Sequence, residues 1–208
     1  MKVLLVNGSV HPKGSTNEAL TIISERLNKL KIDTDIFHLI EPIRDCLGCH
    51  ACGKLDNKCI YDDDCVNKFI SLVKQGVDGF IFGSPVYYAH ASGRLLSFMD
   101  RVFYSSSSLL RYKPASSVCV ARRAGTVSSI DDINKYFLFN RMPIVSSCYW
   151  NEIHGNNAEE LRRDLEGVQI LTTLADNMAW LLQCIDVAKK SGINYPSIED
   201  KIKTNFIR

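Results

Sequence analysis

The sequence has no long hydrophobic run and no excess of charge of either sign. Only four clearly apolar residues lie between Lys2 and Asn7, too few for a secretory signal, and no later segment approaches the length of a membrane span. The 25 Lys and Arg residues nearly balance the 23 Asp and Glu residues, so the net charge of +2 predicts neither nucleic-acid nor membrane binding. We therefore expect a cytoplasmic protein. In that reducing compartment its eight cysteines serve as metal ligands, redox groups or buried residues more readily than as disulfides.

The loop after the first predicted strand, Val3–Val6, lacks the motifs of the common nucleotide folds. A nucleoside-triphosphate loop would carry Gly-x4-Gly-Lys-Ser/Thr, but here Ser15 follows Gly14 where the lysine should stand. The dinucleotide motif Gly-x-Gly-x-x-Gly is absent as well. A phospho-receiver domain would need carboxylates directly after this strand to hold Mg²⁺, and Asn7-Gly8-Ser9 offers none.

The same loop is rich in glycine and hydroxyl groups and runs directly into a predicted amphipathic helix. This order places backbone N–H groups and the hydroxyls of Ser9, Ser15 and Thr16 at the positive end of a helix dipole. Neutral donors without a metal ligand fit a phosphate monoester, such as that of flavin mononucleotide (FMN). A tight strand-to-helix turn that binds no ligand is the alternative at this point. His11 is expected to shape the loop or contact the phosphate, and not to act as an acid–base catalyst.

Strand-like and helix-like segments alternate along the whole chain. Strands are predicted at residues 3–6, 34–39, 79–86, 117–121 and 143–147. A capping box, Ser15-x-x-Glu18, is expected to start the first helix. The last helical segment begins near Asn157 and is bent or interrupted at Gly167. The run Ser105–Ser108 is expected to form a loop.

Five β–α pairs predict an α/β fold, a doubly wound parallel sheet with helices on both faces. The length suits one domain over residues 1–208, with a cysteine-rich loop inserted at 45–65. Ligands of such sheets bind beyond the carboxyl ends of the strands. Three loops with unusual residues leave those ends, and we expect them to meet at one site: 7–17, 84–93 and 122–126.

Two of these loops can contact a planar ring. In Ser84–Tyr88, Pro85 stiffens the turn while neighbouring backbone groups stay free to bind the edge of a flavin, and a tyrosine can form a flat wall. A turn with two half-exposed tyrosines is the alternative. Arg122 or Arg123 can stabilise negative charge near the N1–C2 edge of a reduced flavin, or hold a dinucleotide phosphate. A solvated arginine is the alternative for at least one of them.

The cysteine-rich loop carries Cys46-x2-Cys49-x2-Cys52-x6-Cys59, which places four thiols within fourteen residues. Zinc sites usually draw on two separated Cys-x2-Cys pairs, so a third cysteine only three residues further on fits an iron–sulfur cluster better. A loop of reduced, uncoordinated thiols is the alternative. Cys65 is expected at a helix start. The other three cysteines lie in apolar patterns and are expected to be buried: Cys119, Cys148 and Cys184.

Three stretches together resemble a known family, the NADPH-dependent FMN reductase and iron–sulfur flavoprotein group, on a flavodoxin-like fold. The stretches are Gly8-Ser9…Gly14-Ser15-Thr16-Asn17, Gly83-Ser84-Pro85-Val86-Tyr87-Tyr88…Ser92-Gly93…Phe98-x-Asp100-Arg101 and Arg122-Arg123-Ala124-Gly125. The resemblance covers nearly the whole chain. One departure is His11-Pro12, where the family loop commonly has Pro-Arg, and Lys13 can replace the lost cationic contact.

The resemblance implies a five-stranded parallel sheet of order 2-1-3-4-5 and non-covalently bound FMN, with its phosphate on residues 9–17 and its ring on 84–88 and 122–125. It also implies a homodimer or homotetramer whose neighbouring subunits complete the sites. The cysteine spacing is similar to the compact motif of the iron–sulfur flavoproteins, which implies Cys46, Cys49, Cys52 and Cys59 as ligands of a [4Fe–4S] cluster. The implied FMN-binding residues are Ser9, His11, Gly14, Ser15, Thr16, Asn17, Ser84, Pro85, Val86, Tyr87, Tyr88, Ser92, Gly93, Arg122, Arg123, Ala124 and Gly125.

Two redox functions follow from these expectations. The first is an FMN-dependent NAD(P)H oxidoreductase that reduces a quinone, a nitro or azo compound, or a free flavin. The flavin carries the chemistry, so no catalytic side chain is assigned. The second is an electron carrier that takes electrons from ferredoxin through a [4Fe–4S] cluster into FMN. A flavin-binding module without turnover is the alternative from a different class, because a fold does not determine a function.

Overall fold

The computed structural model describes residues 1–199, 202 and 204, so the last part of the predicted domain over 1–208 lies outside the described residues. Five parallel strands form the sheet in the order β2-β1-β3-β5-β6, and a short strand, β4, pairs antiparallel with β3. The strands are β1 (Lys2–Asn7), β2 (Asp33–His38), β3 (Gly79–Tyr87), β4 (His90–Ala91), β5 (Ala115–Ala121) and β6 (Glu152–His154). The predicted order 2-1-3-4-5 is therefore confirmed, with the numbering shifted by the two-residue β4, although a different segment supplies the fifth strand.

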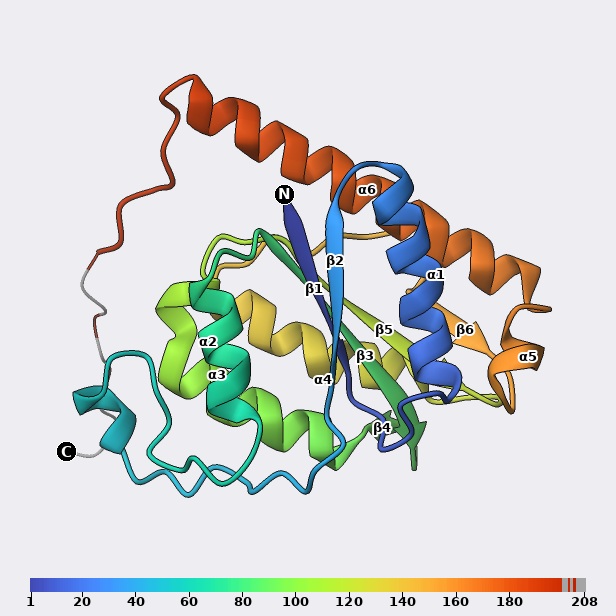
Figure 1. Cartoon of the computed structure of the whole chain (residues 1–208), viewed down its shortest axis with the longest axis horizontal. Helices are drawn as coiled ribbons and strands as arrows, with labels where there is room; N and C mark the ends of the chain where they lie inside the picture. Colours follow the sequence, from blue (N-terminus) through green and yellow to red (C-terminus); the bar gives the residue numbers. More distant parts are fainter. Residues whose placement is uncertain (200–201, 203, 205–208) are drawn as a thin grey trace.

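Helices cover both faces of this sheet (Figure 1), as predicted. They are α1 (Ser15–Lys29), η1 (Ala51–Lys54), α2 (Val66–Lys74), α3 (Gly93–Leu110), α4 (Thr126–Phe139), α5 (Ala158–Leu161) and α6 (Leu165–Lys190). Figure 1 shows α1 and α6 on one side of the sheet and α2, α3 and α4 on the other. None of the helices in the described part of the chain is both long enough and apolar enough to cross a membrane.

Alternate residues of the central strands enter two separate hydrophobic cores. Leu4 and Val6 of β1 pack with the apolar faces of α2, α3 and α4. Val3 and Leu5 pack with α1 and α6 on the opposite face. All four side chains are buried, because successive side chains of a strand point to opposite faces and helices cover both. This double burial explains why the strand has a continuous apolar run.

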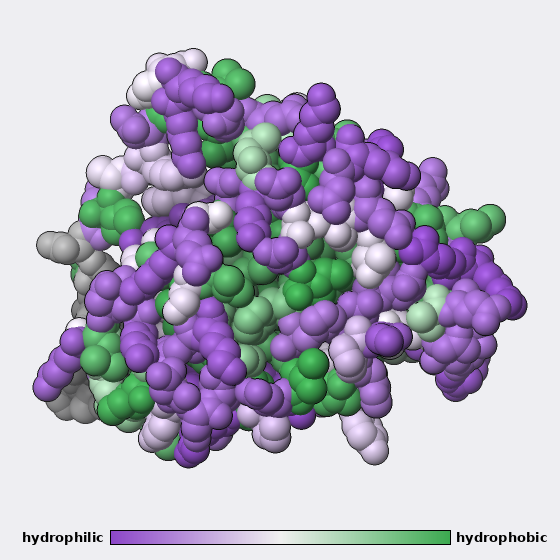
Figure 2. All heavy atoms as spheres, in the orientation of Figure 1, coloured by the Kyte–Doolittle hydropathy of each residue, from purple (hydrophilic) through white to green (hydrophobic). Residues whose placement is uncertain are grey.

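The outer surface is mostly polar. Figure 2 shows a largely hydrophilic face, with hydrophobic residues gathered near its centre, between α1 and α2. That location corresponds to the edge strand β2, whose residues are only half-buried. The distribution agrees with the balanced charge of the sequence.

The predicted fifth strand at residues 143–147 is wrong. Only Ile144 forms a bridge, to Ala115, and the fifth parallel strand is β6, which pairs with Cys119–Ala121. The ladder stops after Val145, because the Ser116 hydroxyl donates to the Val145 carbonyl at 2.8 Å in place of a backbone group. A buried Asn151 then donates to Ser116 at 2.8 Å and brings the chain back to the sheet. β6 was missed because Ile153 is its one fully buried residue.

Two helix predictions need correction or refinement. Ser105–Ser108 is part of α3 and not a loop, although Ser106 has non-helical angles and bends the helix there. The Ser105 hydroxyl donates to the Arg101 carbonyl at 2.7 Å, a bond by which serine is tolerated inside a helix and often bends it. The last helical segment is interrupted, as expected, but at residues 162–164. Asp164 caps the new helix by accepting from the Gly167 N–H.

Candidate functional site

The carboxyl ends of β1, β3, β5 and β6 open onto one pocket, which we call the strand-end pocket. The three loops that were expected to meet at one site all contribute to it, and a fourth loop after β6 joins them. The lining residues are Ser9, His11, Lys13, Gly14, Ser15, Thr16, Pro85, Val86, Tyr87, Val120, Ala121, Arg122, Gly155, Asn156, Asn157 and Ala158.

The first loop reaches α1 through a series of tight turns. Asn7 accepts from the Ser9 N–H at 3.0 Å, and the Ser9 hydroxyl accepts from the His11 N–H at 3.1 Å. Such side-chain turns shape a loop that has few other backbone bonds. They leave Gly14 as the residue before the helix, and a methyl group there would lie 3.0 Å from the His11 side chain.

The start of α1 has no side-chain cap, so the predicted capping box is wrong. Gly14 stands at the cap position, and Glu18 is drawn away to pair with Arg162. The Glu18 N–H, bonded to the Gly14 carbonyl at 3.0 Å, is the first to be paired within the helix. The N–H groups of Ser15, Thr16 and Asn17 precede it, and such groups need a partner from outside the helix. An anion in the strand-end pocket would satisfy them.

Ser84 and Ser92 lie behind the pocket and join two of its loops. The Ser84 hydroxyl accepts from the Ser92 N–H at 2.9 Å, and the Ser92 hydroxyl donates to the Gly8 carbonyl at 2.9 Å. The Gly8 N–H in turn donates to the Gly83 carbonyl at 2.8 Å. Ser92 also caps α3 by accepting from the Leu95 N–H. Both serines are buried, so the geometry gives them a supporting role.

The hairpin between β3 and β4 forms the rim of the pocket. Tyr87 pairs with His90, and the two turn residues, Tyr88 and Ala89, have φ angles of 50° and 61°. Positive φ at both positions is typical of a two-residue hairpin turn. Gly125, with φ of 94°, lies directly behind it, and a Cβ there would lie 2.6 Å from the Ala89 Cα. Glycine therefore allows the α4 loop to support the hairpin closely.

The pocket gathers part of the implied FMN-binding set and adds residues to it. Arg122 lines the pocket, whereas Arg123 is exposed outside it. The loop 155–158 was missed because the fifth strand was misplaced, although Asn156-Asn157 before two glutamates is a helix-start signal. The implied residues that do not line the pocket are Asn17, Ser84, Tyr88, Ser92, Gly93, Arg123, Ala124 and Gly125.

The four cysteines of the inserted loop line a second, smaller pocket, which we call the cysteine pocket. Cys46, Cys49, Cys52 and Cys59 all border it, together with Arg101 of α3. Burial, and after it the charges of the three neighbouring cysteines, raises the pKa of the Cys52 thiol. Within the described residues, no set of three or more His, Cys, Asp or Glu side chains is close enough to hold a single metal ion.

The remaining cysteines are separate from this pocket. Cys65 stands at the cap position of α2, as expected, and burial followed by the charge of Asp64 raises its pKa to about 11. Cys119 is buried, as predicted. The prediction of burial is wrong for Cys148 and Cys184, which are both exposed.

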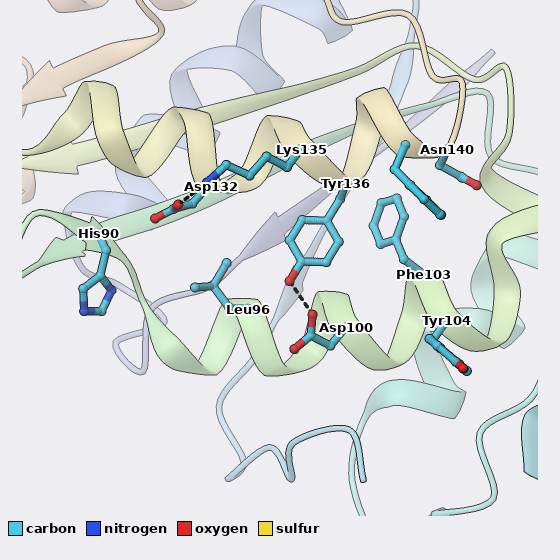
Figure 3. A pocket seen from close by; sticks show the side chains of 10 residues that line it. His90, Leu96, Asp100, Phe103, Tyr104, Asp132, Lys135, Tyr136 and Asn140 are labelled. Carbon is cyan, nitrogen blue, oxygen red and sulfur yellow. Dashed lines mark hydrogen bonds and ion pairs between the residues drawn. The ribbon is translucent and has the colours of Figure 1, made fainter. Parts of the chain in front are cut away.

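A third cavity is an open, largely apolar groove between α3 and α4, which we call the α3–α4 groove (Figure 3). Phe103 of α3 and Tyr136 of α4 lie against each other in it, with ring centres 5.3 Å apart. The Tyr136 hydroxyl donates to Asp100 at 2.5 Å across the groove. Tyr104 borders both this groove and the cysteine pocket, so the two cavities adjoin.

Comparison with known proteins identifies the class that this fold and these pockets define. The family profile of the NADPH-dependent FMN reductases matches residues 1–157. The chain therefore belongs to that family, and it is an FMN-binding flavoprotein with a flavodoxin-like fold.

One sequence relative and two solved structures show what this chain is similar to. An iron-sulfur flavoprotein of Methanocaldococcus jannaschii is 35% identical over 198 residues, which covers 89% of this chain and 99% of the relative. Among solved structures, RosB with a bound 8-demethyl-8-formylriboflavin-5′-phosphate superposes with a TM-score of 0.67 at 11% identity, over 100% of this chain and 94% of RosB. An archaeal flavodoxin gives a TM-score of 0.58 at 14% identity, over 88% of this chain and 99% of the flavodoxin. These structural likenesses establish the shared fold.

Proposed function

We propose that this chain is an electron-transfer flavoprotein that carries FMN in the strand-end pocket and an iron–sulfur cluster in the cysteine pocket. The observation that carries the proposal is that all four spaced cysteines line one pocket, on a fold that offers a separate anion-binding pocket. The relationship to an iron-sulfur flavoprotein of M. jannaschii supports the same combination.

The strand-end pocket fits FMN on chemical grounds. The uncapped start of α1 offers backbone N–H groups, and the hydroxyls of Ser15 and Thr16 lie beside them. Lys13 lines the same pocket and can supply the positive charge that the family loop usually draws from an arginine. The backbone of Pro85–Tyr87 and the side chain of Arg122 then face the ring end. RosB, which shares the fold, binds a riboflavin-5′-phosphate derivative.

The cysteine pocket fits an iron–sulfur cluster better than a single ion. Each cysteine of a [4Fe–4S] site ligates a different iron, so the four sulfurs stand farther apart than the ligands of one metal ion. Four thiols around one pocket match the number of ligands that such a cluster needs. The loop has little regular structure besides η1, so its thiols can adjust to a cluster. Cysteine ligands of this kind need a reducing compartment, which supports the cytoplasmic location expected from the sequence.

In this proposal the protein binds and orients two redox groups. When bound, FMN exchanges electrons singly or as a hydride, and a cluster exchanges them singly. A one-electron donor of the ferredoxin type would therefore reach the cluster at the cysteine pocket. The residues around the strand-end pocket hold the flavin by neutral donors and by Lys13 and Arg122, which also stabilise added negative charge.

Oxidation of NAD(P)H by the flavin is a second candidate activity, with a quinone, a nitro or azo compound, or a free flavin as acceptor. The family match supports it, because that family is named for its dependence on NADPH. Tyr87 stands at the pocket rim with 45% of its surface exposed, where it can flank a planar ring. Anaerobic mixing distinguishes the two candidates. Rapid bleaching of the flavin bands by NADPH or NADH supports the second, and bleaching only by reduced ferredoxin supports the first.

We also propose that a second copy of this chain covers the α3–α4 groove. Within one chain α3 runs from its cap Ser92, which lies behind the strand-end pocket, to Arg101 in the cysteine pocket, about 12 Å beyond Gly93 at the helix rise. A second copy bound in the groove would lie next to the cysteine pocket, because the two cavities adjoin at Tyr104. Electrons could then pass between the cluster of one subunit and the flavin of the other. Phe139, which lines the groove and is 79% exposed, adds apolar surface for such a contact. Sedimentation of the protein at micromolar concentration tests this: a monomer contradicts it.

The proposed function is tested by substituting one cysteine inside the pocket and one outside it. Cys49→Ser should abolish bound iron and inorganic sulfide after anaerobic reconstitution, while FMN content stays unchanged. Cys148→Ser is the matched control, because Cys148 is exposed and remote from the pocket, and it should keep both cofactors. Wild-type protein that takes up FMN but no iron and sulfide under these conditions contradicts the cluster.

A further inference from the structure

Arg101 is the one residue in the cysteine pocket whose burial needs an explanation. Its side chain is 1% exposed, and it reaches the inserted loop from the middle of α3. Arginine is always charged and is seldom fully buried without a partner. The partner is Asp64, whose carboxylate is 3% exposed and accepts from Nη1.

Every N–H of this guanidinium has an acceptor. Arginine has five N–H groups. Nη1 donates to Asp64 and to the Arg44 carbonyl, the latter at 3.3 Å. Nη2 donates to the Tyr61 carbonyl at 3.2 Å. Nε and Nη2 together donate to the Cys59 sulfur, at 3.4 and 3.5 Å.

These acceptors come from both ends of the cysteine-rich loop. Arg44 lies just before Cys46, whereas Tyr61 and Asp64 follow Cys59. The Arg101 side chain therefore ties both ends of the cysteine-rich loop to α3. The same guanidinium also holds the Cys59 sulfur by two N–H groups. A planar fork that is saturated in this way fixes position more strictly than a single charge does.

We propose that Arg101 is a positioning residue for the iron–sulfur cluster: it holds the Cys59 sulfur as a ligand and, by donating to that sulfur, raises the reduction potential of the cluster. The inference rests on the proposed function, because it needs a cluster at the four cysteines. Hydrogen bonds to ligand sulfurs stabilise the reduced, more negative cluster, so they raise its potential.

The test removes the hydrogen bonds without changing the net charge. The double variant Arg101→Gln/Asp64→Asn replaces the buried ion pair by a neutral pair, which avoids leaving an unpaired buried charge. Arg44→Gln/Asp63→Asn is the matched control: it makes the same substitutions at an exposed ion pair of the same loop, whose side chains are 44% and 55% exposed. Both proteins are reconstituted anaerobically, and the midpoint potential of the cluster is measured by a redox titration followed by electron paramagnetic resonance.

We expect the Arg101 double variant to lower the equilibrium constant for cluster reduction at least tenfold, which is a 59 mV shift to more negative potential for one electron. The control pair should leave the potential unchanged. Equal potentials in the two double variants overturn the inference. If the Arg101 double variant retains FMN but takes up no cluster, that loss supports the positioning role. The midpoint potential is then measured on Arg101→Lys, which keeps the charge, loses the planar fork, and should also have a more negative potential than wild type.

The same series separates this inference from the function on which it rests. Wild-type protein without iron and sulfide contradicts the cluster itself, and the inference falls with it. A loaded wild type with a potential insensitive to Arg101 contradicts the inference alone.

Discussion

Removing the two hydroxyls at the start of α1 should weaken the binding of FMN and leave the binding of riboflavin nearly unchanged. Thr16 is 2% exposed, so Thr16→Val keeps its volume while deleting the hydroxyl, and Ser15→Ala deletes the neighbouring one. Riboflavin has the same ring and ribityl chain as FMN and lacks only the phosphate. A difference between the two ligands therefore reports on the phosphate contact.

The size of the effect follows from the hydrogen bonds lost. A hydrogen bond to a charged group contributes about 1.5–3 kcal/mol, so each substitution should raise the Kd for FMN roughly tenfold to a hundredfold. The double variant should fall short of the sum, because both hydroxyls serve one phosphate. Some affinity should remain, since the backbone N–H groups of the first helical turn are unchanged.

The assay is the quenching of flavin fluorescence during titration, with thermal unfolding of each variant as a check of the fold. Thr21→Val is the matched control, because the Thr21 hydroxyl donates to the Asn17 carbonyl within the same helix and faces no phosphate. An unchanged Kd for FMN in the double variant refutes the phosphate position. Equal losses for FMN and riboflavin refute it too, since they would place the hydroxyls at the ring or the ribityl chain.

Three further predictions concern residues around the sites. Gly125→Ala should lower the Tm and weaken FMN binding, because the new Cβ would lie 2.6 Å from the Ala89 Cα at a φ of 94°, and titration with FMN checks it. Asp64→Asn should lower the free energy of unfolding by about 3–5 kcal/mol, because it leaves a buried arginine unpaired. Asp63→Asn, at an exposed pair, should lower the free energy of unfolding by only about 0–1 kcal/mol. Urea titration of both variants measures the difference. Burial lowers the pKa of His38, so its contribution to stability is present above the unfolded pKa of about 6.5 and is lost as the pH falls below it. His38→Gln should therefore flatten the decline of the unfolding free energy as the pH falls below about 6.5.

Three of the predicted strands, β1, β3 and β5, could be found because most of their residues are buried between the two helical layers. The run Val3–Val6 is apolar throughout, since each of its side chains enters a core. β6 could not be found in the same way, because only Ile153 of that strand is fully buried. The fifth strand was predicted at 143–147 because that segment is more apolar. In the structure, side-chain hydrogen bonds of Ser116 and Asn151 interrupt the backbone ladder there.

The two pockets differ in how far local sequence could predict them. The glycine and hydroxyl pattern of the first loop predicted donors at the start of α1, and spacing alone predicted four cysteines at one place. The residue that organises the cysteine pocket was not predictable from spacing, because Arg101 lies 42 positions after Cys59. Nothing in a local pattern indicates that a charge on α3 is buried beneath a distant loop.

We propose that one chain holds both a flavin at the start of α1 and a cluster beside Arg101. Diffraction from anaerobically grown crystals at the iron absorption edge tests it most directly, because anomalous signal locates iron without any assumption about its ligands. We expect an anomalous peak enclosed by Cys46, Cys49, Cys52 and Cys59, with flavin density in the strand-end pocket and its phosphate at Ser15 and Thr16. Flavin density without iron at those sulfurs, or iron bound elsewhere in the chain, would contradict it.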